Sequence, residues 1–188
     1  MSDLLLLPRT PFYYLRHGQT DWNIEGRCQG QTDIPMNAAG EAEVAASVAR
    51  LPLDEITYIV SSPLARAHQS AQLAADRLGL PVVIDDGLKE AFWGEAEGHT
   101  DRSWLPAWRE GESPGGAESF EQFSQRVVDT VIRILSLPVT PLIVAHGGVY
   151  WAIERALGRD GFSHLPNGTL LKHMPREDDA ALWRVTFV

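Results

Sequence analysis

Three short apolar runs, each ending abruptly in a polar segment, constrain the fold of this chain most strongly. The runs are strand-like, helical patterns separate them, and they end at Arg16-His17-Gly18, Ser61-Ser62-Pro63 and His146-Gly147-Gly148. Strands that alternate with helices favour a mostly parallel sheet with helices on both faces. In such sheets, ligands bind outside the carboxyl ends of the strands. The pattern therefore predicts an α/β fold, a three-layer αβα sandwich, with two histidines on one edge of its sheet.

The remaining elements follow from apolar periodicity and from capping residues. Strands are expected at residues 12–15, 56–60, 81–84, 142–145, 169–173 and 182–187. Helices are expected at 37–51, 64–78, 104–109, 120–135 and 147–157, and loops at 18–35 and 87–116. Asn37 is the expected cap of the first helix, while Pro63 should open the second and Gly79 should close it. Without repeats or linkers, residues 1–188 are expected to form a single domain.

Charge and composition exclude several classes of partner. The net charge is −9 and no basic run is present, so neither nucleic acid nor an anionic membrane surface is an expected partner. No apolar stretch approaches the roughly 18 residues that a membrane span requires. Cys28 is the only cysteine, which is consistent with a cytoplasmic location. All of the 16 basic residues except Lys89 and Lys172 are arginine, so an anionic substrate would require arginines gathered in one place.

His17 is the most promising reactive group. It ends a strand, and Gly18 behind it should leave room for a tetrahedral group to approach the imidazole. Arg16 can direct two N–H donors onto phosphate oxygens, and its charge should keep the imidazole neutral. Considered alone, a histidine in such a position is more often a structural residue whose ring binds a backbone carbonyl.

The string around His17 resembles the signature of the histidine phosphatase superfamily, in its phosphoglycerate-mutase-like branch. The pattern Arg-His-Gly-x-Thr-x-x-Asn is matched at Arg16, His17, Gly18, Thr20 and Asn23. Four further segments resemble later motifs of the family in the same order, at residues 25–36, 61–71, 88–98 and 144–149. The resemblance extends from about residue 12 to about residue 170 and implies the phosphoglycerate-mutase-like fold.

This resemblance also implies a role for each matched residue. His17 would attack phosphorus and become phosphorylated, and Glu90 would protonate the leaving alkoxide and then activate water. Phe92 and Trp93 would bury Glu90 and thereby raise the pKa of its carboxyl. The phosphoryl oxygens would be bound by Arg16, Arg66, Asn23, His146 and the N–H of Gly147. The other expected substrate-binding residues are Gly18, Gln19, Thr20, Gln29 and Gly30.

Simpler interpretations of single residues remain open at this point. Arg66 alone is typical of a solvated helix face, and Glu90 alone of a surface carboxylate. Cys28 is equally compatible with a tolerated small residue. The remaining histidines are expected to be ordinary surface or capping residues: His68, His99, His164 and His173.

The predicted function is hydrolysis of a phosphate monoester, with a small phosphorylated metabolite as partner. No P-loop string and no zinc-ligand spacing occur, so neither a metal nor another cofactor is expected. The 87–116 segment contains no adjacent pair of arginines, which favours one phosphate over two, and Trp93, Trp104 and Trp108 suggest an aromatic lid. A cofactor-dependent phosphoglycerate mutase and a non-catalytic phospho-ligand-binding module are the alternatives. The ester itself and the oligomeric state stay open.

Overall fold

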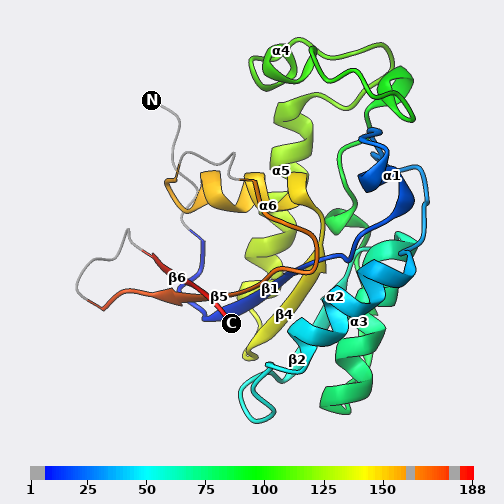
Figure 1. Cartoon of the computed structure of the whole chain (residues 1–188). Coiled ribbons are helices and arrows are strands. Elements are labelled where there is room, and N and C mark those ends of the chain that lie inside the picture. The colour runs from blue at the N-terminus through cyan, green and yellow to red at the C-terminus, as the bar shows by residue number, and fades with distance from the viewer. Residues whose placement is uncertain (1–6, 160–163, 178–182) are drawn as a thin grey trace.

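One six-stranded sheet organises the chain, whose computed structural model describes residues 7–159, 164–177 and 183–188. Its strands lie in the order β3-β2-β4-β1-β5-β6 (Figure 1). Neighbouring strands from β3 to β1 pair in parallel, whereas β5 pairs antiparallel with β1 and β6 antiparallel with β5. The strands are β1 Phe12–Arg16, β2 Tyr58–Ser61, β3 Val82–Ile84, β4 Pro141–Ala145, β5 Leu170–Pro175 and β6 Trp183–Phe187. The expected mostly parallel sheet is confirmed.

Helices cover both faces of this sheet. Side chains alternate between the faces of a strand, so Tyr13 and Leu15 of β1 pack in the core with α2 and α3. Phe12 and Tyr14 point the other way and pack with α5 and α6. These helices are α2 Ala38–Val48, α3 Ala65–Leu78, α5 Phe120–Leu135 and α6 Gly147–Ala156. The two cores confirm the three-layer αβα sandwich.

The predicted helix ends are correct at Asn37 and Gly79 and wrong at Pro63. The side chain of Asn37 accepts a hydrogen bond of 2.9 Å from the Gly40 N–H at the start of α2. Gly79 ends α3 with a φ of 67°, the left-handed conformation that glycine adopts most easily. Helix α3 begins only at Ala65, because Leu64 is still extended and its N–H is bound to the Ser62 hydroxyl. Pro63 therefore precedes the helix instead of forming its first turn.

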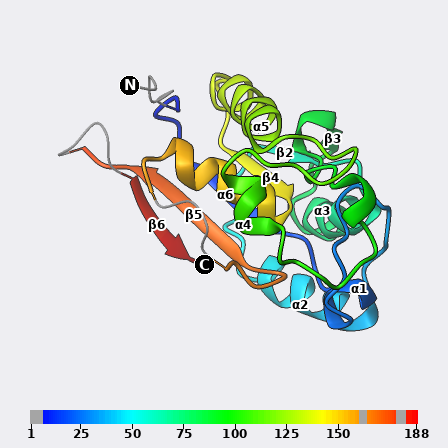
Figure 2. The ribbon, with the colours of Figure 1, turned by 90° about the horizontal axis from the view of Figure 1, so that it is seen from above.

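Short helices lie in both polar segments, 18–35, which was expected to be a loop, and 87–116, where one short helix was expected. Helix α1, Asp21–Ile24, lies within 18–35 and is held by a capping box between Thr20 and Asn23. Within 87–116, α4 covers Leu105–Arg109, close to the expected 104–109, and single 3₁₀ turns cover Asp86–Leu88 and Gly94–Ala96. Figure 2, which looks down from above, places α4 in front of the sheet and its helices.

The register of the sheet brings the three polar segments together. Arg16 at the end of β1 lies beside Ala145 at the end of β4, and Ser61 at the end of β2 lies beside Val144. The segments that follow these strands therefore start from one edge, as the sequence predicted. Leu182, the expected first residue of the last strand, lies outside the described residues. No helix in the described part of the chain is both long and apolar enough to cross a membrane.

Candidate active site

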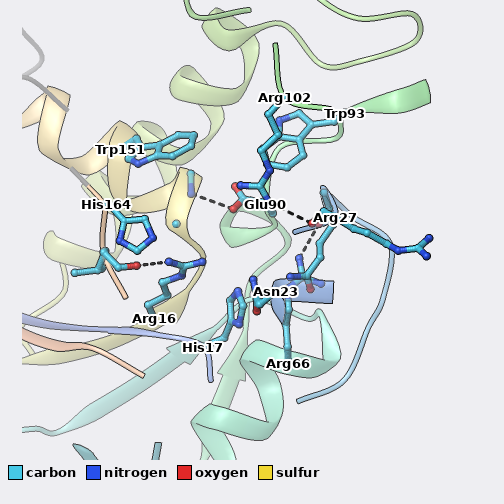
Figure 3. A pocket seen from close by; sticks show the side chains of 15 residues that line it. Arg16, His17, Asn23, Arg27, Arg66, Glu90, Trp93, Arg102, Trp151 and His164 are labelled. Atoms are coloured by element: carbon cyan, nitrogen blue, oxygen red, sulfur yellow. Dashed lines mark hydrogen bonds between the residues drawn. The ribbon is translucent and has the colours of Figure 1, made fainter. Parts of the chain in front are cut away.

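A cavity opens where β1 and β4 end, and most of the predicted site residues line it (Figure 3). His17 lies deep in the cavity, with Arg16 and Arg66 on either side and Glu90 facing it. The predicted residues in its wall are Arg16, His17, Asn23, Gln29, Gly30, Arg66, Glu90 and Gly147. Segments from very different parts of the sequence thus meet at one point.

The imidazole of His17 is oriented and neutral. Its side chain is 3% exposed, and Nδ1 lies 2.8 Å from the Gly18 carbonyl oxygen, to which an Nδ1–H donates. The lone pair is then on Nε2, the nitrogen that a nucleophile needs. Burial lowers the pKa of His17 well below its usual value, and the charges of Arg66 and then Arg16 lower it further. The effect of arginine charge on this pKa was predicted from the sequence, but burial is the larger cause.

Two arginines beside His17 each have a buried Nε–H group without a partner among the described residues. Arg66 is 1% exposed and donates to the carbonyl oxygens of Gly30 and Thr32 at 2.7 and 3.0 Å. Arg16 donates to the carbonyl oxygen of Leu165. The Nε of each arginine is buried and has no hydrogen-bond partner within the described part of the chain. Burial lowers the pKa of Arg66 to about 10, so it stays charged at neutral pH, and the solvated-face interpretation is wrong.

His146 is fully buried beside His17 and is not itself among the described residues that line the cavity. Its ring is fully buried, and its centroid lies 5.2 Å from that of His17. Nε2 lies 2.8 Å from the Ser62 hydroxyl, which itself accepts a hydrogen bond from the Leu64 N–H. In the tautomer in which the Ser62 hydroxyl donates to Nε2, the ring proton is on Nδ1. Nδ1 has no acceptor among the described residues.

The unused donors of Arg16, Arg66 and His146 together indicate an anion site. A buried polar group without a partner costs about 1–3 kcal/mol, and native proteins rarely tolerate several of them in one place. An anion bound against His17 would find these donors beside it. The two guanidinium groups at the ends of parallel strands give the site the positive charge that an anion requires.

Glu90 faces the same cavity and is held by backbone N–H groups. Its side chain is 7% exposed, and its two oxygens accept hydrogen bonds of 3.0 Å from Ala91 and Gly148. Burial raises the pKa of the carboxyl, while these N–H groups and the two arginines oppose the rise. The surface interpretation of Glu90 is therefore wrong. Of the two expected aromatic neighbours, Trp93 lines the cavity, whereas Phe92 is 43% exposed.

Gly148 should be indispensable for the position of Glu90. A Cβ at Gly148 would collide with Oε1 of Glu90, whereas a Cβ at Gly147 would lie 3.5 Å from the nearest Arg16 atom, an ordinary contact. Gly148→Ala is expected to displace the carboxyl and to cost about 1–3 kcal/mol of stability, as overpacking does. Thermal unfolding should show a lower Tm for Gly148→Ala and little change for the matched Gly147→Ala. Equal Tm values for the two variants would contradict this.

Gly18, Gln19 and Thr20 are not among the described residues that line the cavity. A Cβ at Gly18 would collide with the Gly40 carbonyl oxygen, so helix α2 occupies the space that was expected to admit a phosphoryl group. Thr20 is buried and caps α1. A substrate-binding role for these three residues stays a prediction. In the structure they form the loop that follows His17.

Six residues of the cavity wall were not predicted from sequence as site residues. Figure 3 shows Arg102 above Glu90, Trp151 and His164 on the opposite side, and Arg27 turned outward. The six are Arg27, Arg102, Gly148, Trp151, His164 and Leu165. Arg27 also pairs with Glu25 at 2.5 Å. Arg102 thus adds a guanidinium charge to the cavity wall, whereas the charge of Arg27 is paired with that of Glu25.

His173 and the tryptophans behave differently from expectation. His173 is fully buried, stacks on Phe12 at 4.2 Å between ring centroids, and has its pKa lowered by burial to about 3. Its assignment as a surface or capping residue is wrong. The three tryptophans expected to form a lid pack edge to face on one another: Trp93, Trp104 and Trp108. Trp108 is fully buried, so most of this cluster belongs to the hydrophobic core and not to a lid. Of these three, Trp93 reaches the cavity.

The N–H groups of Arg16 and Arg66 at this site that lack a partner among the described residues are hydrogen-bond donors, which bind anions. In residues 7–159, 164–177 and 183–188, no three His, Cys, Asp or Glu side chains gather as metal ligands do. Cys28 is buried.

Fold and cavity together define a class of α/β protein that presents a neutral histidine, guanidinium groups and a carboxyl to an anion at its strand ends. The chain belongs to the histidine phosphatase superfamily (branch 1), whose family description matches residues 12–173. Its fold is the phosphoglycerate-mutase-like one that the sequence motifs implied.

Relatives and solved structures agree with this assignment and comprise phosphatases and mutases. The chain is 36% identical over 148 residues to the probable phosphoglycerate mutase GpmB of Enterobacter sp. (strain 638), covering 72% of this chain and 68% of that protein. It is 34% identical over 141 residues to the uncharacterized phosphatase PhoE of Bacillus subtilis (strain 168), covering 74% and 72%. A mycobacterial glucosyl-3-phosphoglycerate phosphatase complexed with VO3 superposes with a TM-score of 0.80 at 28% identity, covering 94% and 97%.

Proposed function

We propose that this chain is a metal-independent, cytoplasmic phosphatase that hydrolyses a small phosphate monoester through a phosphohistidine at His17. The observation that carries the proposal is the set of buried, unused N–H donors around the neutral imidazole of His17. Donors fixed in advance toward developing charge are the largest contribution to many enzymatic rates. The family relationship to phosphatases and mutases supports the same chemistry.

The first chemical step transfers the phosphoryl group to His17. The lone pair on Nε2 attacks phosphorus, the bond from phosphorus to the ester oxygen breaks, and the leaving oxygen takes a proton from Glu90. Arg16, Arg66 and His146 bind the phosphoryl oxygens throughout. The burial that raises the pKa of Glu90 keeps a proton available on it at higher pH than on an exposed carboxyl.

The second step releases phosphate. Glu90, now ionised, removes a proton from a water molecule, whose oxygen attacks phosphorus as the bond to Nε2 breaks. The products are inorganic phosphate and neutral His17, and the proton is back on Glu90. Each group thus returns to its starting state without a further reactant.

Turnover of p-nitrophenyl phosphate in excess chelator tests the proposal. We expect release of p-nitrophenolate between mildly acidic and neutral pH, unaffected by the chelator. A panel of phosphorylated metabolites assayed in the same buffer, with kcat/KM for each, would then identify the preferred ester. Tight binding of phosphate without turnover of any ester would favour the binding-module alternative and contradict hydrolysis.

Cofactor-dependent phosphoglycerate mutase is a second candidate, favoured by the cations at the cavity mouth. Arg102 lies above Glu90 in the cavity wall (Figure 3), so it would face the leaving group of an ester bound at His17. A carboxylate or second phosphate on the substrate would suit it. Interconversion of 2- and 3-phosphoglycerate that requires a bisphosphoglycerate primer would establish the mutase, and its absence in a coupled assay would remove this candidate.

A further inference from the structure

The carboxylate of Glu97 binds four donors from two separate loops. Oε2 accepts hydrogen bonds from the backbone N–H and the hydroxyl of Thr32, at 2.9 and 2.6 Å. Oε1 accepts from the backbone N–H groups of Gln31 and Trp93, at 2.9 and 3.1 Å. Glu97 thereby ties the loop at residues 30–32 to the loop that continues from Glu90.

The first of these loops holds Arg66. The carbonyl oxygens of Gly30 and Thr32 accept from the two terminal nitrogens of Arg66, and they alternate with the N–H groups that bind Glu97. Gly30 has a φ of 52°, and a Cβ there would collide with the Glu97 carboxylate. The loop is therefore fitted closely around Glu97 on one side and Arg66 on the other.

The second loop carries the proposed acid. Trp93 follows Glu90 by three residues and lines the cavity, and its N–H is bound to Glu97. The side chain of Gln31, whose own N–H binds Glu97, donates to the Glu90 carbonyl oxygen at 3.1 Å. Both loops are thus fixed to each other directly behind the cavity wall.

We propose that Glu97 is a positioning residue that aims Arg66 at the phosphoryl group and holds the Glu90 loop beside it. Glu97 contacts neither reacting atom, and its charge faces that of Arg66. A carboxylate is required because all four partners are donors, and an amide at this position would turn its NH₂ toward two of them. This inference rests on the proposed function, since it assigns Arg66 to phosphoryl binding.

A double-mutant cycle with Glu97→Gln and Arg66→Met separates this role from general stabilisation. Glu97→Gln alone should lower kcat/KM by about 10–100-fold, the usual effect of removing a partner that orients a site residue. In the Arg66→Met background, the same change should cost clearly less, because one of the two groups that Glu97 positions is already gone. Equal losses in both backgrounds would overturn the proposal. Glu95→Gln, an exposed carboxylate on the same turn, should leave activity unchanged.

Two further measurements test the same coupling between Glu97 and Arg66 independently of the Glu97→Gln activity. Thr32→Val removes a single hydrogen bond to Glu97, so it should give a smaller loss of the same non-additive kind even if Glu97→Gln unfolds. Calorimetric Kd values for inorganic phosphate should show the same coupling between Glu97 and Arg66. Coupled phosphate binding without turnover of any ester would overturn the hydrolysis and preserve the role of Glu97, whereas additive losses in an active enzyme would overturn the role of Glu97 alone.

Discussion

Replacement of His17 by alanine is expected to lower kcat/KM by about 10⁴-fold or more, the scale on which an enzyme loses rate without its nucleophile. The loss should be this large because every other group at the site acts on a phosphoryl group that His17 must first accept. Arg16, Arg66 and His146 stay in place in the variant, so phosphate should still bind. The expected signature is therefore a lost kcat with a phosphate Kd changed by much less.

A covalent intermediate offers a more direct measurement of the same role. Rapid quenching of the wild-type protein with labelled substrate should trap a phosphoprotein that survives alkali and is hydrolysed by acid, as a phosphorus–nitrogen bond is. The label should be absent from His17→Ala and unchanged in His68→Ala, which removes an exposed histidine. A labelled His17→Ala protein would refute the nucleophile.

The pH dependence follows from burial of the same ring. The pKa of His17 is lowered, so the imidazole becomes protonated only at pH values well below its usual titration. For p-nitrophenyl phosphate, whose leaving group needs no proton from Glu90, kcat/KM should consequently stay high through neutral pH and fall on the acidic side, where the lone pair on Nε2 is lost. A fall beginning near the ordinary pKa of histidine would contradict a buried, neutral nucleophile.

The positions of His17, Ser62 and His146 were predictable from sequence because each follows a short strand at a clear break. Three parallel strands must end at one edge of their sheet, so local patterns were enough to place these groups together. Helix α5 was predicted at its observed bounds for a similar reason, since its apolar face repeats at helical spacing.

What the sequence did not reveal depends on contacts between distant segments. His173 looks polar and local, yet the register of β5 places it beside Phe12 and buries it. Arg102 and His164 reach the cavity from segments without periodicity, so no spacing rule identifies them. Glu97 appears as one acidic residue in a glycine-rich stretch, and its four partners become visible only when the loops are folded together. Helix α1 is four residues long, too short for a periodic signal.

Replacement of Glu90 by glutamine should separate the two chemical steps by the leaving group that is used. An alkyl phosphate needs a proton on its leaving oxygen, so the first step should slow by about 10²–10⁴-fold. p-Nitrophenolate leaves without a proton, so the first step should stay fast with that ester. The second step still lacks its base, and the phosphorylated enzyme should accumulate.

The expected result for Glu90→Gln is a burst of p-nitrophenolate, up to one equivalent of enzyme, followed by slow turnover, with no burst from an alkyl phosphate. Wild-type kcat/KM for the alkyl ester should fall as pH rises through the pKa of Glu90, since only the protonated carboxyl donates. Burial raises that pKa, so the fall should begin above the ordinary carboxyl range, and it should vanish in Glu90→Gln. Glu95→Gln provides the matched exposed control. Equal slowing of both esters without a burst would assign the proton transfer to another group, because a residue that merely supports the fold cannot distinguish one leaving group from another.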